Sequence, residues 1–187
     1  SYYIVDFAKL VSQVRQKSPW SSVGVTELYG NISIFSTDPT KSNSGNMFSG
    51  LLANMYNNGQ VVTKDSVSPL LPEIKQTFDS LGFMPHSSGD IFKSFLNTGI
   101  GGKPIIVGYE NQAIEFVIAN IDYKDFINNK IRTLYPRPTV WSSHPVIALN
   151  DKGRTLIEAL KDEEIQKMAW EEHGFRSGLL GVMNDPS

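Results

Sequence analysis

The stretch Ser33-Ile-Phe-Ser-Thr-Asp-Pro-Thr-Lys-Ser-Asn-Ser-Gly-Asn46 decides how this chain is interpreted. It has the pattern of a short buried strand that leads into a loop of hydroxyl and amide side chains, and the loop opens directly onto a helix. That helix is predicted to begin near Ser44 or Gly45 and to reach about Asn57. The evidence is a set of apolar residues at the spacing of a helix with one buried face: Phe48, Leu51, Leu52 and Met55.

A loop that opens onto a helix in this way can bind an anion. The first backbone N–H groups of a helix have no partner inside it, and the aligned peptide dipoles leave partial positive charge there. Lys41 would add a full charge, and Gly45 would let the backbone approach a ligand closely. The alternative is a helix capped by its own Ser or Asn, which needs no ligand. The ligand residues predicted in this loop are Ser36, Thr37, Lys41, Ser42, Asn43, Ser44 and Gly45.

A similar arrangement occurs further along the chain. The Ser-Ser-Gly turn at residues 87–89 precedes a helix predicted from Asp90. Residues 104–107, Pro-Ile-Ile-Val, are a continuous apolar run typical of a strand buried on both faces. Small ligands of open α/β sheets lie outside the carboxyl ends of strands, so Tyr109 is predicted at the mouth of the same crevice. These segments add Ser87, Ser88, Gly89, Tyr109 and Glu110 to the predicted ligand residues.

The composition favours one globular domain with a hydrophobic core. The chain has 187 residues, no cysteine and a net charge of −2. The lack of cysteine excludes disulfides, thiolate metal sites and a cysteine nucleophile. The small net charge, without long runs of one sign, favours no nucleic-acid partner. No apolar run reaches the roughly 18 residues of a membrane-spanning helix.

Helices and strands are predicted to alternate, which favours an α/β fold with a largely parallel sheet flanked by helices. Asp6 is predicted to cap the first helix and Asp162 the last, which Gly174 ends. The strand at 131–135 is predicted to end before Pro136-Arg137-Pro138, because proline cannot continue a ladder. Besides the segments above, helices are predicted at 7–14, 68–81, 110–120, 122–129 and 152–173, and strands at 31–36, 104–108, 131–135 and 146–149.

Four segments carry a family resemblance: residues 36–45, 87–90, 104–112 and 162–176. They look like the corresponding parts of bacterial extracytoplasmic solute-binding proteins of the type II periplasmic-binding fold. The closest similarity is to the binders of molybdate and related oxyanions, and it spans about residues 25–176. The resemblance implies that the loop ending at Gly45, the turn at 87–90 and Tyr109 contact a small oxyanion such as molybdate, tungstate or sulfate.

The resemblance also implies a role in transport without catalysis. Such a protein delivers a small anionic solute to the permease of an ABC-type uptake transporter, and we therefore expect an extracytoplasmic location. We expect contact with the membrane only through that transporter or through an anchor outside this chain. The resemblance implies no cofactor, no catalytic residue and no metal ligand.

The chain differs from that family in its extent. It is similar to the second lobe, so residues 1–187 are predicted to form a single solute-binding lobe with a core at about 25–135. Residues 1–24 and 136–187 are then inter-lobe and C-terminal helical segments, and the first lobe is expected to be absent. The segment Leu179–Ser187 has neither a cap nor a closing strand, so we expect a longer parent protein. An isolated lobe should bind its ligand weakly.

Alternative functions remain open at this level. One is a ligand-sensing domain of the same fold in a regulator, and another is binding of a different small anionic or organic solute. A third is a small-molecule enzyme that uses Glu110 or His86, with Asp38 and Glu110 as a possible carboxylate pair. No G-x-S-x-G nucleophile motif is present, and the three histidines lack metal-ligand spacing. His86 adjoins the turn at 87–89 and could contact a ligand, whereas His173 is predicted at a helix end.

Overall fold

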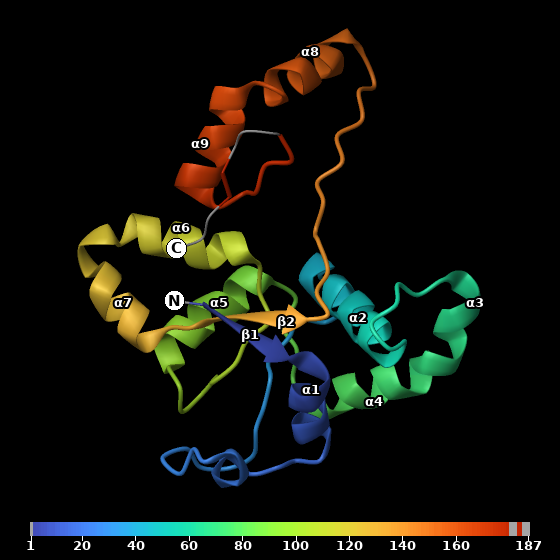
Figure 1. Cartoon of the computed structure of the whole chain (residues 1–187), viewed down its shortest axis with the longest axis vertical. Coiled ribbons are helices and arrows are strands. Elements are labelled where there is room, and N and C mark those ends of the chain that lie inside the picture. Colours follow the sequence, from blue (N-terminus) through green and yellow to red (C-terminus); the bar gives the residue numbers. More distant parts are fainter. Residues whose placement is uncertain (1, 180–182, 185–187) are drawn as a thin grey trace. The chain divides into compact units, whose positions relative to one another are not determined.

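The computed structural model describes residues 2–179 and 183–184, and Figure 1 shows its helices and strands. It is a mixed α/β protein, which confirms the fold class at this level, and helices account for 54% of it. The chain divides into two compact units. The larger unit contains residues 2–109 and 134–141, and the smaller unit contains residues 110–133 and those from 142 onward. The single solute-binding lobe over residues 1–187 stays a prediction.

The larger unit begins with a short strand and is otherwise mainly helical. Its elements are β1 (Tyr2–Asp6), α1 (Phe7–Arg15), α2 (Asn43–Tyr56), α3 (Lys64–Val67), α4 (Leu71–Leu81), α5 (Ser88–Thr98) and, from Leu134 on, β2 (Thr133–Arg137), with 3-10 turns at Trp20–Val23 and Ser68–Leu70. β1 and β2 pair in parallel as a two-stranded sheet. The helices therefore supply most of the surfaces that can form a core.

The core of the larger unit is built from α1, α2 and α4. The Phe48 ring of α2 makes edge-to-face contacts with Phe7 of α1 and Phe78 of α4, at centroid distances of 5.9 and 5.7 Å. Leu52, one turn further along α2, has no exposed surface. Each such side chain contributes about 1.5–3 kcal/mol by leaving water. The buried residues of this core are Phe7, Val11, Val14, Ile32, Ile34, Phe48, Leu51, Leu52, Ala53, Ile74, Phe78 and Leu81.

The smaller unit is formed by helices with few buried side chains. Its elements are α6 (Glu110–Ala119), a 3-10 turn at Ile121–Tyr123, α7 (Lys124–Lys130), α8 (Asp151–Leu160) and α9 (Glu163–His173). Among its described residues, Ile127 and Trp170 are the buried apolar ones. The Arg176 guanidinium lies over the Trp170 ring, 5.1 Å from its centroid.

Helices lie in each of the predicted regions, and the caps expected at Asp6, Asp162 and Gly174 are confirmed. α2 and α5 begin one or two residues before their predicted starts. The Asp6 carboxylate accepts a hydrogen bond from the Lys9 N–H at the start of α1. The Asp162 carboxylate accepts from the Glu164 and Ile165 N–H groups at the start of α9. Gly174 follows α9 in the left-handed region, with φ of 69°. Local capping chemistry therefore decided these boundaries.

The strands predicted at 31–36 and 104–108 are wrong as strands, although the two segments do pair. They meet at one isolated parallel bridge between Phe35 and Ile106. Phe35 N–H donates to the Ile105 carbonyl at 2.9 Å, and Val107 N–H donates to the Phe35 carbonyl at 2.8 Å. Ile32 and Ile34 are buried as expected. The apolar pattern therefore predicted burial correctly, but the pairing of the two segments does not extend into a ladder.

Two further strand predictions need correction, and one strand was missed. β2 includes Pro136, which was expected to lie beyond its end. Each strand of a two-stranded sheet has one edge without a partner strand. Proline, which lacks an N–H group, can face that edge without the loss of a ladder hydrogen bond. β1 at Tyr2–Asp6 was not predicted, because its residues are mostly exposed and it pairs with β2, which is distant in sequence. Residues 146–149 form no strand, and Ile147 and Leu149 are 80% and 91% exposed, so this apolar run found no partner.

The prediction for Leu179–Ser187 falls mostly outside the described residues. Asn184, which is described, binds Ser177 through both ends of its amide: the Ser177 N–H donates to Oδ1 and the Asn184 Nδ2 donates to the Ser177 carbonyl, each at 2.8 Å. These bonds join Asn184 to Ser177, four residues after the end of α9.

Candidate functional site

Hydrogen bonds within the larger unit join the three segments that were predicted to bind a ligand. The Asp38 N–H donates to the Pro85 carbonyl at 3.0 Å, which joins the loop before α2 to the turn before α5. The Asn43 amide donates to the Tyr109 hydroxyl at 2.9 Å. Residues 36–45, the turn 85–89 and Tyr109 are therefore neighbours, and we call them the candidate site.

The parallel bridge explains why these segments meet. Phe35 and Ile106 lie side by side with their chains running in the same direction. Ser36 directly follows the first bridge residue, and Tyr109 follows the second by three positions. Both segments therefore deliver polar side chains at their carboxyl ends, the position expected for ligand contacts in α/β proteins.

The two helices that begin at the candidate site are not capped by their own side chains. Ser42 and Ser87 occupy the N-cap positions of α2 and α5, and neither side chain makes a capping hydrogen bond. Within the described residues, hydrogen bonding from the amides of α2 starts with Asn46, which donates to the Ser42 carbonyl, and in α5 it starts with Ile91. The first-turn N–H groups that are left for a ligand belong to Asn43, Ser44, Gly45, Ser88, Gly89 and Asp90.

Side-chain capping occurs at four other α-helices among the described residues. The side chains of Asp6, Thr63, Asn150 and Asp162 all accept hydrogen bonds from the first turn that follows them. Serine is as good an N-cap as these residues. The uncapped starts of α2 and α5 therefore argue against the simpler interpretation of two self-capped helices.

Gly45 is required by the way α2 packs on the preceding loop. A Cβ atom at this position would lie 2.5 Å from the Thr37 carbonyl oxygen and 2.8 Å from the carbonyl carbon and oxygen of Asp38. Such distances force the backbone to move. The lack of a side chain at Gly45 thus leaves room for the protein's own loop. The predicted close approach of a ligand to the Gly45 backbone stays a prediction.

Several predicted ligand hydroxyls are buried and bonded within the loop. Thr37 and Ser44 have 0% and 4% exposure, and their hydroxyl oxygens lie 2.6 Å apart. Ser36 is also buried, and its hydroxyl donates to the Thr37 carbonyl at 3.3 Å. The Ser42 hydroxyl lies 3.1 Å from that of Ser44. These side chains hold the loop in shape, whereas Lys41, Asn43, Ser87 and Gly89 are the exposed members of the predicted set.

Three ionisable groups meet where the two loops touch. Lys41 Nζ lies 3.3 Å from His86 Nε2 and 4.0 Å from Asp38 Oδ2. The Asp38 carboxylate accepts from the Thr40 hydroxyl at 2.7 Å and from the Thr40 N–H at 2.8 Å. These two bonds, with smaller contributions from the Lys41 and His86 charges, lower the pKa of Asp38 below its ordinary value. The carboxylate is therefore charged at neutral pH.

Glu110 has a different environment from the rest of the predicted set. It is the first residue of α6 in the smaller unit, and Arg176 donates to its two carboxylate oxygens from Nε and Nη2, each at 2.6 Å. The paired guanidinium balances the Glu110 charge. Asp38 and Glu110 thus have separate partners, and their role as a carboxylate pair stays a prediction.

The other histidines lie in the smaller unit. His173 ends α9 as predicted, and its Nδ1 lies 3.2 Å from a carboxylate oxygen of Glu115. The His144 ring contacts Phe175 edge to face at 5.6 Å between centroids. The described residues contain no group of three or more His, Cys, Asp or Glu side chains that could hold a metal ion.

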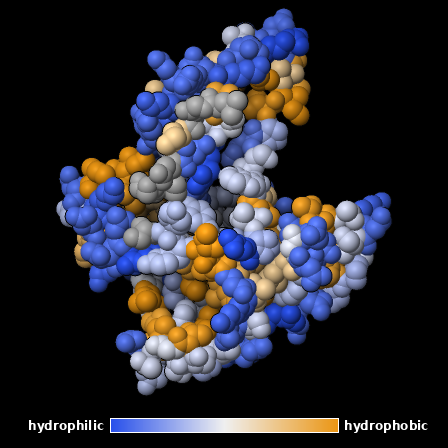
Figure 2. Space-filling view, in the orientation of Figure 1, coloured by the Kyte–Doolittle hydropathy of each residue, from blue (hydrophilic) through white to orange (hydrophobic). Residues whose placement is uncertain are grey.

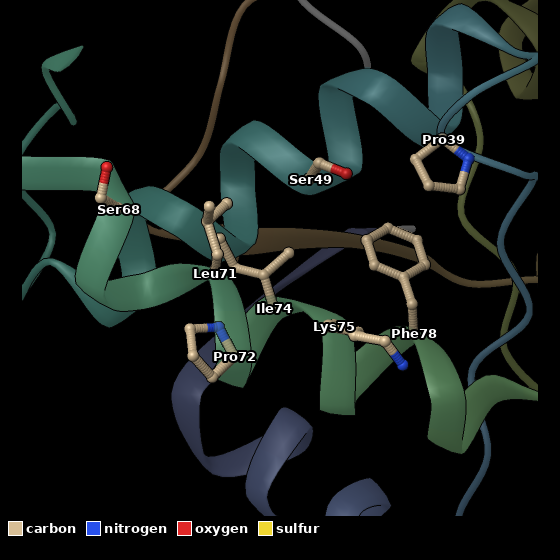
Figure 3. Close-up of a pocket in the computed structure, with 8 residues that line it drawn as sticks. All are labelled: Pro39, Ser49, Ser68, Leu71, Pro72, Ile74, Lys75 and Phe78. Carbon is tan, nitrogen blue, oxygen red and sulfur yellow. The ribbon is translucent and has the colours of Figure 1, made fainter.

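The larger unit also has an open apolar groove of about 590 Å³. Figure 3 shows the side chains of Leu71, Ile74 and Phe78 extending from α4 toward α2. Lys75 is the one charged residue among those that line it. The groove contains none of the predicted ligand residues and offers little to an anion. Its lining residues are Pro39, Ser49, Ser68, Leu71, Pro72, Ile74, Lys75 and Phe78.

Comparisons with protein-family models, with curated proteins and with solved structures give no match. None of the helices in the described part of the chain has both the length and the apolar character needed to cross a membrane.

Proposed function

We propose that this chain binds a small oxyanion at the candidate site and catalyses no reaction on it. The observation that carries the proposal is the pair of helix starts, α2 and α5, whose N-cap serines leave the first-turn N–H groups to another acceptor. An oxyanion accepts several such bonds and is favoured by the dipoles of both helices. Each helix has more than two turns, so each dipole is developed.

Side chains of the candidate site suit the same ligand. The Lys41 ammonium supplies a positive charge, and the Asn43 amide and the Ser87 hydroxyl supply neutral donors. Hydrogen bonds to a charged acceptor are about twice as strong as neutral ones. The buried bond between Thr37 and Ser44 holds the loop so that these donors need little ordering when the ligand arrives.

The biological role that we propose is solute capture for an ABC-type uptake transporter, on the extracytoplasmic side of the membrane. In this proposal the chain is a type II periplasmic-binding lobe, its ligand is molybdate, tungstate or sulfate, and its partner is the transporter permease. Support comes from the sequence motifs and from the parallel pairing of Phe35 with Ile106, which directs both motifs to one edge. A second lobe would close over the ligand and exclude water, so this chain alone should bind weakly.

Backbone amide NMR tests the binding proposal on the whole chain. Molybdate, tungstate, sulfate and phosphate are each titrated at constant ionic strength, with chloride as the reference anion. We expect saturable shifts at the amides of residues 43–45 and 88–90, because these N–H groups are the proposed donors. Shifts that are absent, or that spread evenly over the surface, would overturn the proposal.

A pair of lysine variants separates a site from general attraction to positive charge. Lys41→Met should weaken oxyanion binding about tenfold, the effect of losing one charge-assisted bond of about 1.4 kcal/mol. Lys75→Met is the control, because Lys75 lies on α4, is 76% exposed and pairs with Asp79. Equal losses in both variants would mean that the anion responds to net charge and not to the candidate site.

A further inference from the structure

Residues 142–149 of the smaller unit form an irregular segment that takes no part in the candidate site. The segment leads from β2 to α8 and contains neither helix nor strand, and Figure 1 shows it as a trace that enters α8. Pro145 lies in its middle, and a proline biases the residue before it toward extended backbone. Extended backbone is the form in which a peptide can pair with the edge of another protein's sheet.

The backbone of this segment is open to such pairing. Within the described residues, no N–H or C=O group of residues 142–149 takes part in a hydrogen bond. The His144 ring contacts Phe175 edge to face, and Ala148 lies against Gly153, where an added Cβ would be 3.2 Å from the Ala148 Cα. Residues 145–147 lie between these two contacts. Another protein can therefore engage them without breaking a backbone hydrogen bond of the described structure.

The side chains of the segment are large, apolar and exposed. Val146, Ile147 and Leu149 have 50%, 80% and 91% of their surface in water. Many endopeptidases choose the bond that they cut by the fit of one such side chain into an apolar pocket. Exposed segments of this kind are also the preferred sites of proteolytic nicking in folded proteins. Backbone and side chains thus meet the same requirement at one place.

The loop after α2 shows that exposure of a side chain is not sufficient. Val61 is 78% exposed, nearly as much as Ile147. Its neighbours are tied down, because the Gln60 N–H donates to the Asn57 carbonyl at 3.0 Å and the Val62 N–H donates to the Asn54 side chain at 3.1 Å. A protease must open this loop before it can bind it, so Val61 is an internal control.

We propose that residues 145–149 are a cleavage site for endopeptidases that select large apolar residues, and that the site is cut in the native fold. Hydrolysis of the Val146–Ile147 bond adds one water molecule and leaves a carboxylate on Val146 and an amino group on Ile147. All of the larger unit, residues 2–109 and 134–141, precedes this bond. The cut therefore separates α8 and α9 covalently from a larger unit whose buried core is complete. The proposal does not rest on oxyanion binding.

Brief digestion of the full chain with thermolysin, which cuts before large apolar residues, tests the proposal. Intact-mass spectrometry should show residues 1–146 and 147–187 as the first products. A cut that needs no unfolding should keep its rate in low urea, once a peptide substrate has corrected for the effect of urea on the enzyme. Cleavage at Val61 should appear only as urea increases the population of opened molecules.

Substitutions in the segment identify the recognised residues. A variant that combines Val146→Asp, Ile147→Asp and Leu149→Asp should lose the first cut, and its fold should persist because these side chains are exposed. Val61→Asp is the matched control and should be cut at the wild-type rate. If the triple variant fails to fold, the urea dependence of the wild-type cut still decides the question.

Three results would overturn the proposal. One is a first cut outside residues 145–149, and another is an unchanged rate in the folded triple variant. The third is a wild-type cut that accelerates with urea in parallel with cleavage at Val61, because the segment would then be accessible only after unfolding. Amide NMR of the cut protein checks the remaining claim: the resonances of the larger unit should persist, and their loss would contradict its completeness.

Discussion

The larger and the smaller unit are stabilised in different ways. In the larger unit, α1, α2 and α4 bury a continuous apolar cluster that includes Ile34, and the loop of the candidate site follows Ile34 closely and packs on α2 at Gly45. In the described part of the smaller unit, the buried apolar side chains are Ile127 and Trp170. Burial is the main stabilising term in folding, so the larger unit can hold a rigid site and the smaller unit relies on local interactions.

Those local interactions are caps and surface ion pairs. Asn150 and Asp162 cap α8 and α9 through their side chains. The exposed pairs of Arg154 with Asp151 and of Lys161 with Glu158 join residues one turn apart. Such pairs contribute about 0–1 kcal/mol each. The stability of the smaller unit is therefore a sum of small terms.

Apolar and polar residues are mixed on the surface of the protein. On the face that Figure 2 shows, apolar residues form several patches with polar residues between them. In the smaller unit Ile121, Tyr123 and Phe126 are all more than half exposed. These side chains stabilise the unit little in this structure, since most of their surface remains in water.

The largest expected effect is on the core of the larger unit. Leu52→Ala should lower the free energy of unfolding by about 2–5 kcal/mol, because the side chain is fully buried and leaves a cavity. Leu156→Ala on α8 is the matched control: Leu156 is 54% exposed, and its replacement should change stability by no more than about 0.5 kcal/mol. Urea denaturation measures both. Equal effects would show that the two units do not differ in the way described.

The next effect separates the two glycines of α2. Gly45→Ala should destabilise the protein by about 1–3 kcal/mol, because the new Cβ meets the backbone of Thr37 and Asp38. It should also abolish the amide shifts caused by oxyanions, since the first turn of α2 must move. Gly50→Ala meets nothing within 4 Å and should stabilise α2 by about 0.5–1 kcal/mol. Thermal unfolding gives both signs, and a tolerated Gly45→Ala would contradict the packing of the loop.

A smaller effect concerns the caps. Asp162→Ala removes the acceptor for two N–H groups of α9 and should cost about 1 kcal/mol, visible as faster hydrogen exchange in α9. Ser87→Ala is the comparison, because the Ser87 side chain makes no capping bond to α5. Its effect on exchange in α5 should be clearly smaller. A loss in α5 as large as that in α9 would mean that Ser87 caps its helix and that the first-turn amides are not left for a ligand.

The smallest expected effect is the pH dependence of folding stability that Asp38 contributes. Its pKa is lowered in the folded protein, chiefly by the Thr40 hydroxyl, from an ordinary value of 3.8. The ionised carboxylate therefore stabilises the fold above that ordinary value, and the contribution is lost as the pH falls through the folded pKa. Thr40→Val removes the largest cause. Its urea midpoint should lie slightly below that of the wild type at neutral pH and converge with it in acid; parallel curves would contradict this role of Asp38.

The sequence predicted the helices better than the strands, for a physical reason. The helix boundaries at Asp6, Asp162 and Gly174 depend on contacts between residues a few positions apart. Such contacts can be predicted from the local sequence. The strands at 31–36 and 146–149 required partners far along the chain. One of these segments found a partner at Ile106 through a single bridge, and the other found none.

The candidate site was predicted in part for the same reason. The loop at 36–45 and the turn at 87–89 were identified by their composition and by the helices that follow them. The sequence could not show whether the Ser42 and Ser87 side chains cap those helices, because a serine before a helix is the same residue whether or not its hydroxyl accepts a first-turn N–H. Nor could it pair Glu110 with Arg176 or His86 with Lys41, since those contacts depend on how distant segments pack.

The sequence by itself determined where the helices of this protein lie, which of their faces are apolar, and that two polar loops open onto helix starts. These features depend on residues within a turn or two of one another. Only the tertiary structure decided that the two loops and Tyr109 meet, that the serine caps are unused, and that Gly45 serves the packing of the loop. Each of these depends on atoms brought together by the buried core, whose geometry no local pattern contains.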